Sequence, residues 1–553
     1  MDFAVEDVAV TNGTVNALTQ IGTAAFAVEV QPTAFGPVTL SVPEGAAVLL
    51  EDGTTPNAPS DSLVLVYREV PGPLGPFGPG GVGDEASLAL WLRADAGVTG
   101  APVSAWTDVR SGNGAAAVQS EMSRRPTWEA DGLGGRPAIR FDGEDDALVA
   151  AAVPLDRAIS AFAVAAGEAV EWDEHGWIAS ARGDNGYILH PWKASSMYQS
   201  VVIDTAGHYA EATPFWIVDA GLPQFYGLIY DQTDWDQAMY TVINDQRIPF
   251  PDPGLGARID DHPVDIRFGW DFDDRYGTGR IAEEIVYTRR LMESHRTIVS
   301  NYTAARYGLP LGSLQRYFRP GQPEEVAGIG RISAFDLHTD AQGTGNVRIL
   351  ASSDLGDGEF LLWGHDGAGM EAALPYPFLT PRVARTYGYE ATGEPGTVEL
   401  RIDDAGAFAD LGPSPSVPGV IVAEGEDFLP GSAPAFYPLA WSGSYWTTNV
   451  PFVGSGVFTF GMQPALSVSE SIAESALHLY PNPADDRVTV RWTHADPTGA
   501  VVRLRDAAGR TVVELPFDGR VEVTLDLSGL APGCYLVEAA KATGAVRSRL
   551  VIR

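Results

Sequence analysis

Two short acidic stretches supply carboxylates that could bind a metal ion. They are "FDGEDDA", with Asp142, Asp145 and Asp146, and "WDFDDR", with Asp271, Asp273 and Asp274. Calcium is a hard cation that takes about six to eight oxygen ligands, many of them from carboxylates. Neither stretch has the spacing of an EF-hand loop, and acidic residues gather by chance in a chain this rich in them. The sequence therefore leaves two interpretations of each stretch open, a calcium site and an ordinary acidic turn.

Aromatic residues are denser between residues 170 and 240 than elsewhere in the chain. Aromatic rings stack on sugars, but they also fill the cores of β-sandwiches, so most of them are expected to be core residues. Trp177, Trp192 and Trp235 stand beside Gly, Pro or acidic turn residues rather than within apolar alternation. These three tryptophans are the predicted candidates for a glycan-binding site.

Two further motifs could do chemistry. Cys534 is the single cysteine, so the chain forms no internal disulfide and has no Cys/His cluster with zinc spacing. The neighbours of Cys534 indicate a packed thiol rather than a nucleophile. Arg182-Gly183-Asp184 matches the tripeptide of integrin ligands, but a glycine-centred turn before the next strand is the favoured interpretation.

The chain carries a formal net charge of −36, from 72 acidic and 36 basic residues. So negative a surface repels nucleic acid and anionic lipid, which excludes both as partners. A general solubility bias is one explanation of the charge, and adaptation to a salty medium is the favoured one. No apolar run reaches the ~20 residues of a membrane span, so no membrane insertion is expected.

The length of 553 residues predicts several domains. Alternating runs such as "FAVEDVAV" and "DSLVLVYREV" indicate a small β-sandwich over residues 1–70, which resembles a partial bacterial immunoglobulin-like repeat. A Pro/Gly linker is expected at 71–85, a β-rich domain at 313–465 and a polar linker at 466–475. A helix from about Glu293 to Tyr307 is expected to end at Gly308 and Pro310.

Residues 86–312 carry three motifs in a fixed order. These are Trp91-Leu92-Arg93-Ala94-Asp95, the turn from Trp106 to Gly114, and the hairpin from Gly135 to Gly143. Together they resemble the laminin-G-like, concanavalin A-like jelly rolls of bacterial surface proteins. The resemblance implies an all-β fold, a concanavalin A-like jelly-roll sandwich accompanied by smaller immunoglobulin-like β-sandwich domains.

Some laminarinase-like relatives of this fold are glycoside hydrolases with an E-x-D-x-x-E strand, which sets two carboxylates ~5 Å apart. Here Glu171 and Asp173 fit that spacing, but Gly176 takes the third position. Glu283 and Glu284 are neighbours and should point to opposite faces of a strand. No catalytic residue is therefore assigned, and the sequence predicts a protein that is not an enzyme.

The last unit, 476–553, opens with Tyr480-Pro481-Asn482-Pro483 and continues as alternating strands to "RLVIR". It resembles the C-terminal sorting domain of type IX secretion substrates in the Bacteroidetes. The resemblance implies recognition by the type IX export machinery, with Tyr480, Pro481, Asn482 and Pro483 as its motif. It also implies that the protein is secreted or attached to the cell surface.

The N-terminal "MDFAVEDVAV" lacks the basic and apolar regions of a signal peptide. A type IX substrate needs such a signal, so a truncated start is expected. The predicted function is that of a non-enzymatic, adhesin-like or lectin-like protein that binds a polysaccharide or surface glycan. A polysaccharide-degrading enzyme or its carbohydrate-binding accessory, and a structural surface-layer protein, are the alternatives.

Overall fold

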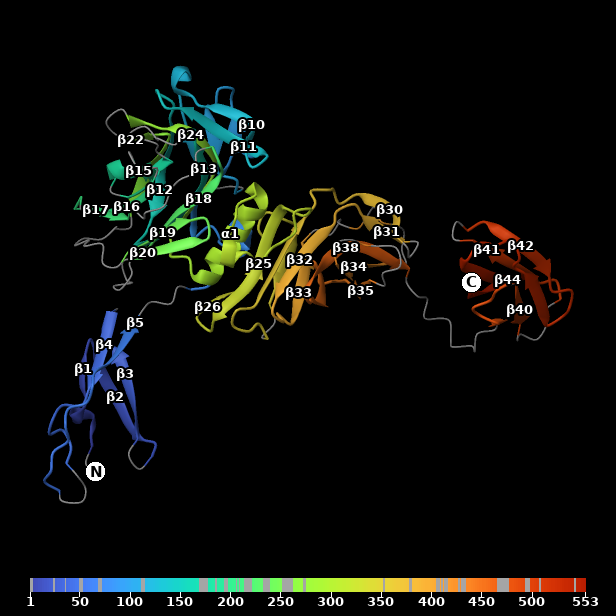
Figure 1. Ribbon diagram of the computed structural model, residues 1–553, viewed down its shortest axis with the longest axis horizontal. Coiled ribbons are helices and arrows are strands. Elements are labelled where there is room, and N and C mark those ends of the chain that lie inside the picture. The colour runs from blue at the N-terminus through green and yellow to red at the C-terminus, as the bar shows by residue number, and fades with distance from the viewer. Residues whose placement is uncertain are drawn as a thin grey trace. The chain divides into compact units, whose positions relative to one another are not determined.

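The computed structural model describes residues 3–553 apart from several short segments and loops. Those left out are 23–24, 35, 49–52, 68–71, 111–114, 169–177, 185, 193–196, 205, 208, 213–220, 232–238, 251–261, 272–274, 352–353, 377–379, 404–407, 409–410, 412–415, 426–427, 429–433, 465–476, 493–497, 507–508 and 542–543. The chain divides into two compact units, Met1–Pro464 and Ala465–Arg553. Almost all of its regular structure is strand (Figure 1).

Two antiparallel sheets form the jelly roll, and the fold class predicted from the motifs is confirmed. Its first sheet contains, in spatial order, β10 (Thr127–Leu133), β11 (Arg136–Asp142), β24 (Thr278–Tyr287), β13 (Ala158–Gly167), β18 (Gln224–Asp231), β19 (Met239–Ile243) and β20 (Gln246–Phe250), and β6 (Leu88–Arg93) also pairs with β24. Its second sheet contains β17 (Tyr209–Ala212), β16 (Met197–Ile203), β15 (Tyr187–Trp192), β14 (Ala179–Ser180), β21 (His262–Phe268), β12 (Leu148–Leu155), β9 (Ala116–Val118), β8 (Ala105–Thr107) and β7 (Val98–Thr99).

The first sheet is buried on both faces. Ile139 and Phe141 of β11 point into the apolar core between the two sheets, whereas Ala138 belongs to a second apolar cluster on the opposite face. This alternation follows from the period of two residues along a strand. A sheet covered on both faces has its side chains fixed by packing, which makes it a rigid base for a site.

The single α-helix among the described residues, α1 (Glu293–Tyr307), covers the outer face of the first sheet. Its bounds are those predicted, and Gly308 ends it with a φ of 69°, in the left-handed region that glycine adopts without strain. At its start, the backbone N–H groups of Glu293 and Ser294 donate to the carboxylate of Asp336, each at 3.0 Å. Asp336 comes from the next module, so that module supplies the helix cap.

This next module, called the second β module, consists of two more sheets between residues 324 and 464. One contains β26 (Asp336–His338), β25 (Glu324–Ser333), β29 (Phe360–His365), β32 (Tyr387–Thr392), β38 (Ser455–Pro464), β31 (Thr380–Val383) and β30 (Ala372–Tyr376), with β34 (Ser416–Glu424) and β35 (Ala435–Pro438) attached. The other contains β27 (Asp340–Ala341), β28 (Val347–Leu350), β33 (Thr397–Ile402), β37 (Trp446–Pro451) and β36 (Ala440–Trp441).

The jelly roll and the second β module share one apolar cluster. Trp91 of β6 and Ile298 of α1 pack in the same cluster as Phe360 and Leu362 of β29, and α1 lies beside β25 (Figure 1). Burying apolar side chains stabilises a protein by roughly 25 cal/mol per Å², so this shared cluster holds the two modules as one packed body.

The Pro/Gly segment predicted as a linker is packed rather than free in solvent. Leu74 and Val82 are buried in the shared cluster, and the N–H groups of Gln342 and Gly343 donate to the carbonyl of Pro76. A Cβ on Gly81 would lie 2.6 Å from the Cβ of Ala341, so only glycine fits at this close approach. The segment is therefore part of the interface between the modules.

The N-terminal residues form two small sheets. One sheet contains β1 (Ala9–Thr11), β4 (Gly36–Ser41) and β5 (Leu63–Tyr67). The other contains β2 (Gly13–Gln20) and β3 (Phe26–Pro32). Val8, Val38 and Leu40 are the buried residues of their core. A small β-sandwich was predicted here from the alternation of apolar residues.

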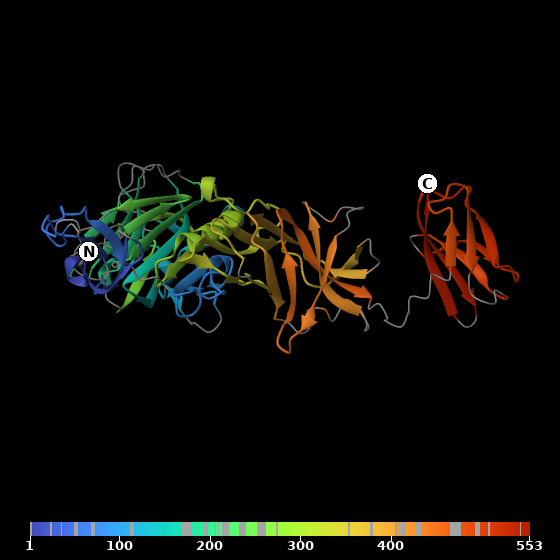
Figure 2. The same ribbon diagram turned by 90° about the horizontal axis from the view of Figure 1, so that it is seen from below.

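The C-terminal unit, red in Figure 2, is a β-sandwich of two sheets. One sheet contains β39 (Leu477–Tyr480), β40 (Arg487–Trp492) and β43 (Glu522–Asp526), and the other β42 (Thr511–Pro516), β41 (Val501–Arg505), β44 (Gly533–Lys541) and β45 (Gly544–Ile552). Among the described residues of the whole chain, no helix has the length and apolar character needed to span a membrane.

Candidate functional site

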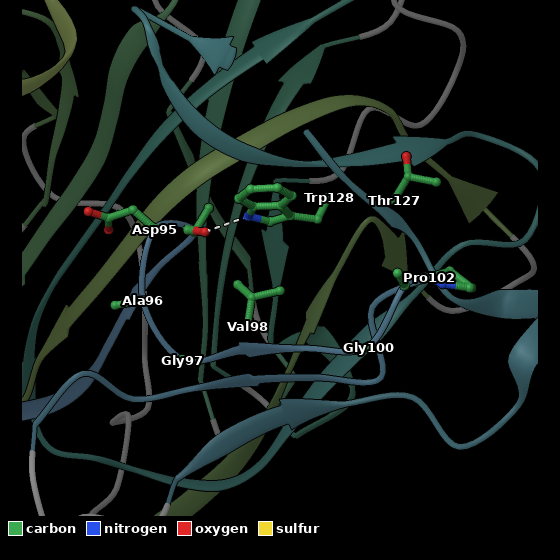
Figure 3. A pocket seen from close by; sticks show the side chains of 10 residues that line it. Asp95, Ala96, Gly97, Val98, Gly100, Pro102, Thr127 and Trp128 are labelled. Atoms are coloured by element: carbon green, nitrogen blue, oxygen red, sulfur yellow. Dashed lines mark hydrogen bonds between the residues drawn. The ribbon is translucent and has the colours of Figure 1, made fainter. Parts of the chain in front are cut away.

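A pocket opens at the edge of the jelly roll where β10 meets the loops on either side of β7. Its volume is about 420 Å³, within the range typical of small-ligand sites. We call it the Trp128 pocket, and it is lined by Ala94, Asp95, Ala96, Gly97, Val98, Gly100, Ala101, Pro102, Thr127 and Trp128. In Figure 3 the indole ring of Trp128 lies above Val98, with Asp95 on one side and Pro102 on the other.

Trp128 is exposed because β10 is an edge strand of its sheet. It pairs with Ile139 of β11, and directly paired residues share a face of the sheet. Ile139 is fully buried in the core, whereas Trp128 is 44% exposed. The indole N–H donates to the carbonyl of Ala94 at 2.7 Å (Figure 3). The ring is thus held in place by a hydrogen bond while much of its surface remains open to a ligand.

The floor of the pocket depends on a glycine turn. Gly97 follows β6 with a φ of 72°, and a Cβ there would lie 2.5 Å from the carbonyl oxygen of Thr107. Only glycine accepts both constraints. The turn brings Val98 and the loop after it beneath the edge of β10, and it follows directly from the Trp-Leu-Arg-Ala-Asp motif of the sequence.

Asp95 is the charged side chain of the pocket lining. Its carboxylate accepts hydrogen bonds from Arg93, at 2.9 and 3.0 Å, and from Arg306 of α1. Burial raises the pKa of Asp95, but the two arginines outweigh it and hold the pKa below its usual range. The Asp95 carboxylate therefore stays ionised over the whole physiological pH range, and its charge is paired with those of Arg93 and Arg306.

The first of the predicted calcium sites is a compact cluster. Oxygen atoms of Asp142, Asp145 and Asp146 lie within 4.8 Å of one another. Asp142 Oδ1 also accepts the backbone N–H groups of Glu144, Asp145 and Asp146, at 2.9 to 3.4 Å. Burial first, and then the charges of Asp142 and Asp145, raise the pKa of Asp146 to about 6. A set of carboxylate oxygens whose charges repel fits a hard divalent cation.

The second predicted calcium site is placed only in part. Asp271 is fully buried, and its carboxylate accepts from Ser180 at 2.9 Å, Arg182 at 3.3 Å and Arg275 at 3.2 Å. Asp273 and Asp274 lie outside the described residues. In the described part, Asp271 acts as the counter-ion of two arginines.

The side chains of the three tryptophan candidates fall on parts of the chain that the structure does not describe. Trp177 and Trp235 lie outside the described residues, and Trp192 ends β15 with a side chain that is not described. The sequence reasoning missed Trp128, which stands in the stretch "RPTWEADGL". The available signal was polar Thr127, Glu129 and Asp131 alternating with Trp128. The strand's place at the edge of the sheet is set by pairing with distant residues.

Glu283 and Glu284 point to opposite faces of β24, as predicted. Glu283 accepts hydrogen bonds from Trp91 Nε1 at 2.6 Å and from the hydroxyls of Tyr302 and Tyr307 at 3.0 and 2.9 Å. Glu284 accepts from Tyr187 inside the sandwich at 3.0 Å. Both are fully buried, and burial raises both pKa values. Neither carboxylate is presented to a glycan.

The Arg-Gly-Asp tripeptide forms a short 3₁₀ turn, Arg182–Asp184, before β15. This confirms the predicted turn. Arg182 is engaged by Asp271 and lies over the ring of Tyr209, 5.8 Å from its centroid. Its guanidinium is therefore committed to the fold.

In the C-terminal unit, the Tyr-Pro-Asn-Pro motif fastens the first strand to the last. The amide of Asn482 donates to the carbonyl of Arg549 at 2.7 Å and accepts from the N–H of Val551 at 2.9 Å. Tyr480 is 43% exposed, and its hydroxyl donates to Glu522 Oε1 at 2.8 Å. The motif thus presents an exposed ring beside two prolines, Pro481 and Pro483, at the start of the sandwich.

The prediction of a packed thiol at Cys534 was wrong. Cys534 is exposed, and Arg549 Nη2 lies 3.4 Å from its sulfur. Cys534 and Leu536 share the outward face of β44, while Val537 of the same strand is buried. Apolar neighbours in sequence did not imply burial because alternate residues of a strand face opposite sides.

Comparison with known proteins identifies the C-terminal unit. Residues 478–553 match the family described as the secretion system C-terminal sorting domain. The chain therefore carries a sorting domain of this family, which indicates export by the type IX system and a secreted or cell-surface protein. No curated protein matches the chain at a significant level.

Several solved structures are similar to parts of the chain at low identity. A SAP-like pentraxin from Limulus polyphemus has 15% identity, covers 30% of this chain and 82% of its own, and has a TM-score of 0.25. Domain 4 of AbnA, an extracellular arabinanase from Geobacillus stearothermophilus in complex with arabinotriose, has 13% identity, 39% and 98% coverage and a TM-score of 0.24. The binding domain of botulinum neurotoxin serotype G has 12% identity, 79% and 92% coverage and a TM-score of 0.30. At these scores the fold rests on the sheets of the chain itself.

Proposed function

We propose that this protein is exported through the type IX system and binds a polysaccharide or surface glycan outside the cell without cleaving it. The observation that carries the proposal is the half-exposed ring of Trp128 over a pocket of about 420 Å³. The nonpolar C–H face of a sugar ring stacks on an indole, while its hydroxyls need a few polar groups around it. Asp95, Thr127 and the backbone of the glycine turn supply such groups.

The charge of the site selects among glycans. The pocket lining contains one carboxylate, Asp95, and no cationic side chain, and the whole chain carries a net charge of −36. A uronic acid or a sulfated sugar would meet repulsion from the negative charge of the chain as a whole. We therefore propose a neutral glycan, of which one or two sugar rings occupy the pocket.

We also propose that calcium binds at Asp142, Asp145 and Asp146. The three carboxylates are close enough to share one ion. A cation would offset the burial of the Asp146 charge, which is the main cause of its raised pKa, and also the repulsion from Asp142 and Asp145. We also propose the domain division predicted from the sequence, with one change. The jelly roll and the second β module pack as one body, because they share an apolar cluster.

A glycan array probed with the full chain tests the function, in the presence and absence of calcium. Trp128→Ala is the test variant, and Trp441→Ala is the matched control because Trp441 is 41% exposed on β36, outside the pocket. The proposal expects binding to neutral glycans that Trp128→Ala abolishes and Trp441→Ala retains.

Three other results would contradict the proposal. Binding that survives in Trp128→Ala would move the site elsewhere. Release of sugar from a bound polysaccharide would favour a polysaccharide-degrading enzyme. Binding to no glycan with or without calcium would favour a structural surface-layer protein.

A further inference from the structure

We infer that the second β module positions the Trp128 pocket through a chain of ion pairs from Glu324 to Asp95. The inference rests on the proposed function, because it concerns the same pocket. It assigns a role to residues 324–464: they are the structural support of the binding site in the neighbouring jelly roll.

The chain begins at the start of β25, where two glutamates of the second β module face arginines of the jelly roll. Glu324 Oε1 accepts from Arg136 Nη2 of β11 at 2.5 Å, and Glu324 Oε2 lies 3.7 Å from Arg306 Nη1 of α1. Glu325 lies 3.6 Å from Arg93 Nη1 of β6. The two modules thus meet through charges as well as through the shared apolar cluster.

The chain continues from the arginines to the pocket. Arg306 and Arg93 both donate to the carboxylate of Asp95, which lines the pocket. The residue before it, Ala94, accepts the indole N–H of Trp128. The carbonyl of Ala94 belongs to the peptide bond that joins Ala94 to Asp95. The ion pairs that hold the Asp95 side chain therefore also hold the acceptor that orients the Trp128 indole.

The balance of charge makes this chain sensitive to a single change. The ion pairs of the junction join three arginines, Arg93, Arg136 and Arg306, to the carboxylates of Asp95, Glu324 and Glu325. The buried carboxylate of Glu283 also interacts with Arg93 and Arg306. The Arg306 side chain is 1% exposed, and a buried charge that loses a partner cannot be solvated in place. Neutralising Glu324 therefore forces Arg306 and Asp95 to rearrange, and the rearrangement reaches the peptide that holds Trp128.

The substitution Glu324→Gln in the full chain tests this inference, because it keeps the shape of the side chain and removes its charge. The first readout is the ¹H–¹⁵N resonance of the Trp128 indole without ligand, assigned by its absence in Trp128→Phe. The second is the affinity for the glycan identified on the array. We expect the resonance to shift and the affinity to fall about 2- to 30-fold, the range for residues that couple to a site without touching the ligand.

A matched control is an acidic residue that pairs with an arginine of the same strand. Asp357 pairs with Arg331 of β25 at 2.6 Å, and its side chain is 61% exposed. Asp357→Asn removes one negative charge from the second β module outside the junction, and it should leave both the resonance and the affinity unchanged. Glu324→Asp keeps the charge and should restore part of the wild-type resonance position.

The two readouts separate this inference from the proposed function. An unchanged Trp128 resonance in Glu324→Gln would overturn the positioning role, whether or not a glycan binds. A shifted resonance in a protein that binds no glycan would support the positioning role and contradict the function. If Glu324→Gln does not fold, Glu325→Gln gives the same test through Arg93. The distance between Glu325 and Arg93 is 3.6 Å, against 2.5 Å between Glu324 and Arg136.

Discussion

The acidic cluster of the jelly roll makes a testable prediction about stability and pH. Asp146 is 6% exposed, and its pKa is raised to about 6 from an ordinary value of 3.8. Between these values the folded state binds a proton that the unfolded state releases. The stabilising contribution of Asp146 is therefore fully present below pH 3.8, and it is lost as the pH rises through about 6. Above that pH, the charged carboxylate destabilises the fold.

The magnitude follows from the two pKa values. Their difference, at about 1.4 kcal/mol per pH unit, corresponds to about 3 kcal/mol in the free energy of unfolding. Asp146→Asn cannot ionise, so it should be more stable than the wild type at pH 8 by up to about 3 kcal/mol. At pH 4 the gain should be small, because the wild-type carboxyl is then mostly protonated in the folded state.

Urea unfolding followed by tryptophan fluorescence measures this difference. Trp492 is the one tryptophan beyond residue 464, so the signal reports on the unit Met1–Pro464. Asp145→Asn is the control, since it removes one negative charge from the same loop at a more exposed position. An Asp146→Asn variant that is no more stable than Asp145→Asn at pH 8 would show that the buried carboxylate of Asp146 does not destabilise the fold.

Three further predictions concern the metal, the buried carboxylate and export. Calcium at about 100 times its dissociation constant should raise the unfolding free energy of the wild type by about 2.7 kcal/mol, and Asp146→Asn should lose most of that gain; equal gains in both proteins would argue against the site. Glu283→Ala should destabilise the fold by about 3–5 kcal/mol in urea unfolding, because it leaves three buried donors without their acceptor and removes the negative charge beside Arg93 and Arg306. A loss below 1 kcal/mol would contradict the described contacts. Deleting 476–553 should hold the protein inside the cell envelope, as measured by surface labelling of intact cells, and unchanged display would contradict the role of the sorting domain.

Local features of the fold could be predicted from the sequence. The helix Glu293–Tyr307 was found because its apolar residues recur at helical spacing and Gly308 allows the left-handed end. Glu283 and Glu284 were placed on opposite faces because a strand alternates. The sorting domain was found because its motifs occur in order. The first two signals each lie within one short stretch, and the third is a series of short motifs along 478–553.

Features set by distant residues could not be predicted. Trp128 is open because β10 is an edge strand, which follows from sheet order rather than from local pattern. The sequence of 71–85 is typical of a Pro/Gly linker, but Gly81 fits against Ala341 of the second β module. Arg306 and Glu324 meet across the junction, although nothing in their neighbourhoods predicts the pair.

A glycan that occupies the pocket should contact the ring of Trp128. The most direct measurement is a titration of the full chain with the neutral glycan that binds best on the array, followed through the indole ¹H–¹⁵N resonance of Trp128. We expect a saturable shift of this resonance, with the same dissociation constant as the binding of the glycan to the full chain. A glycan that binds while the Trp128 resonance stays in place would contradict it.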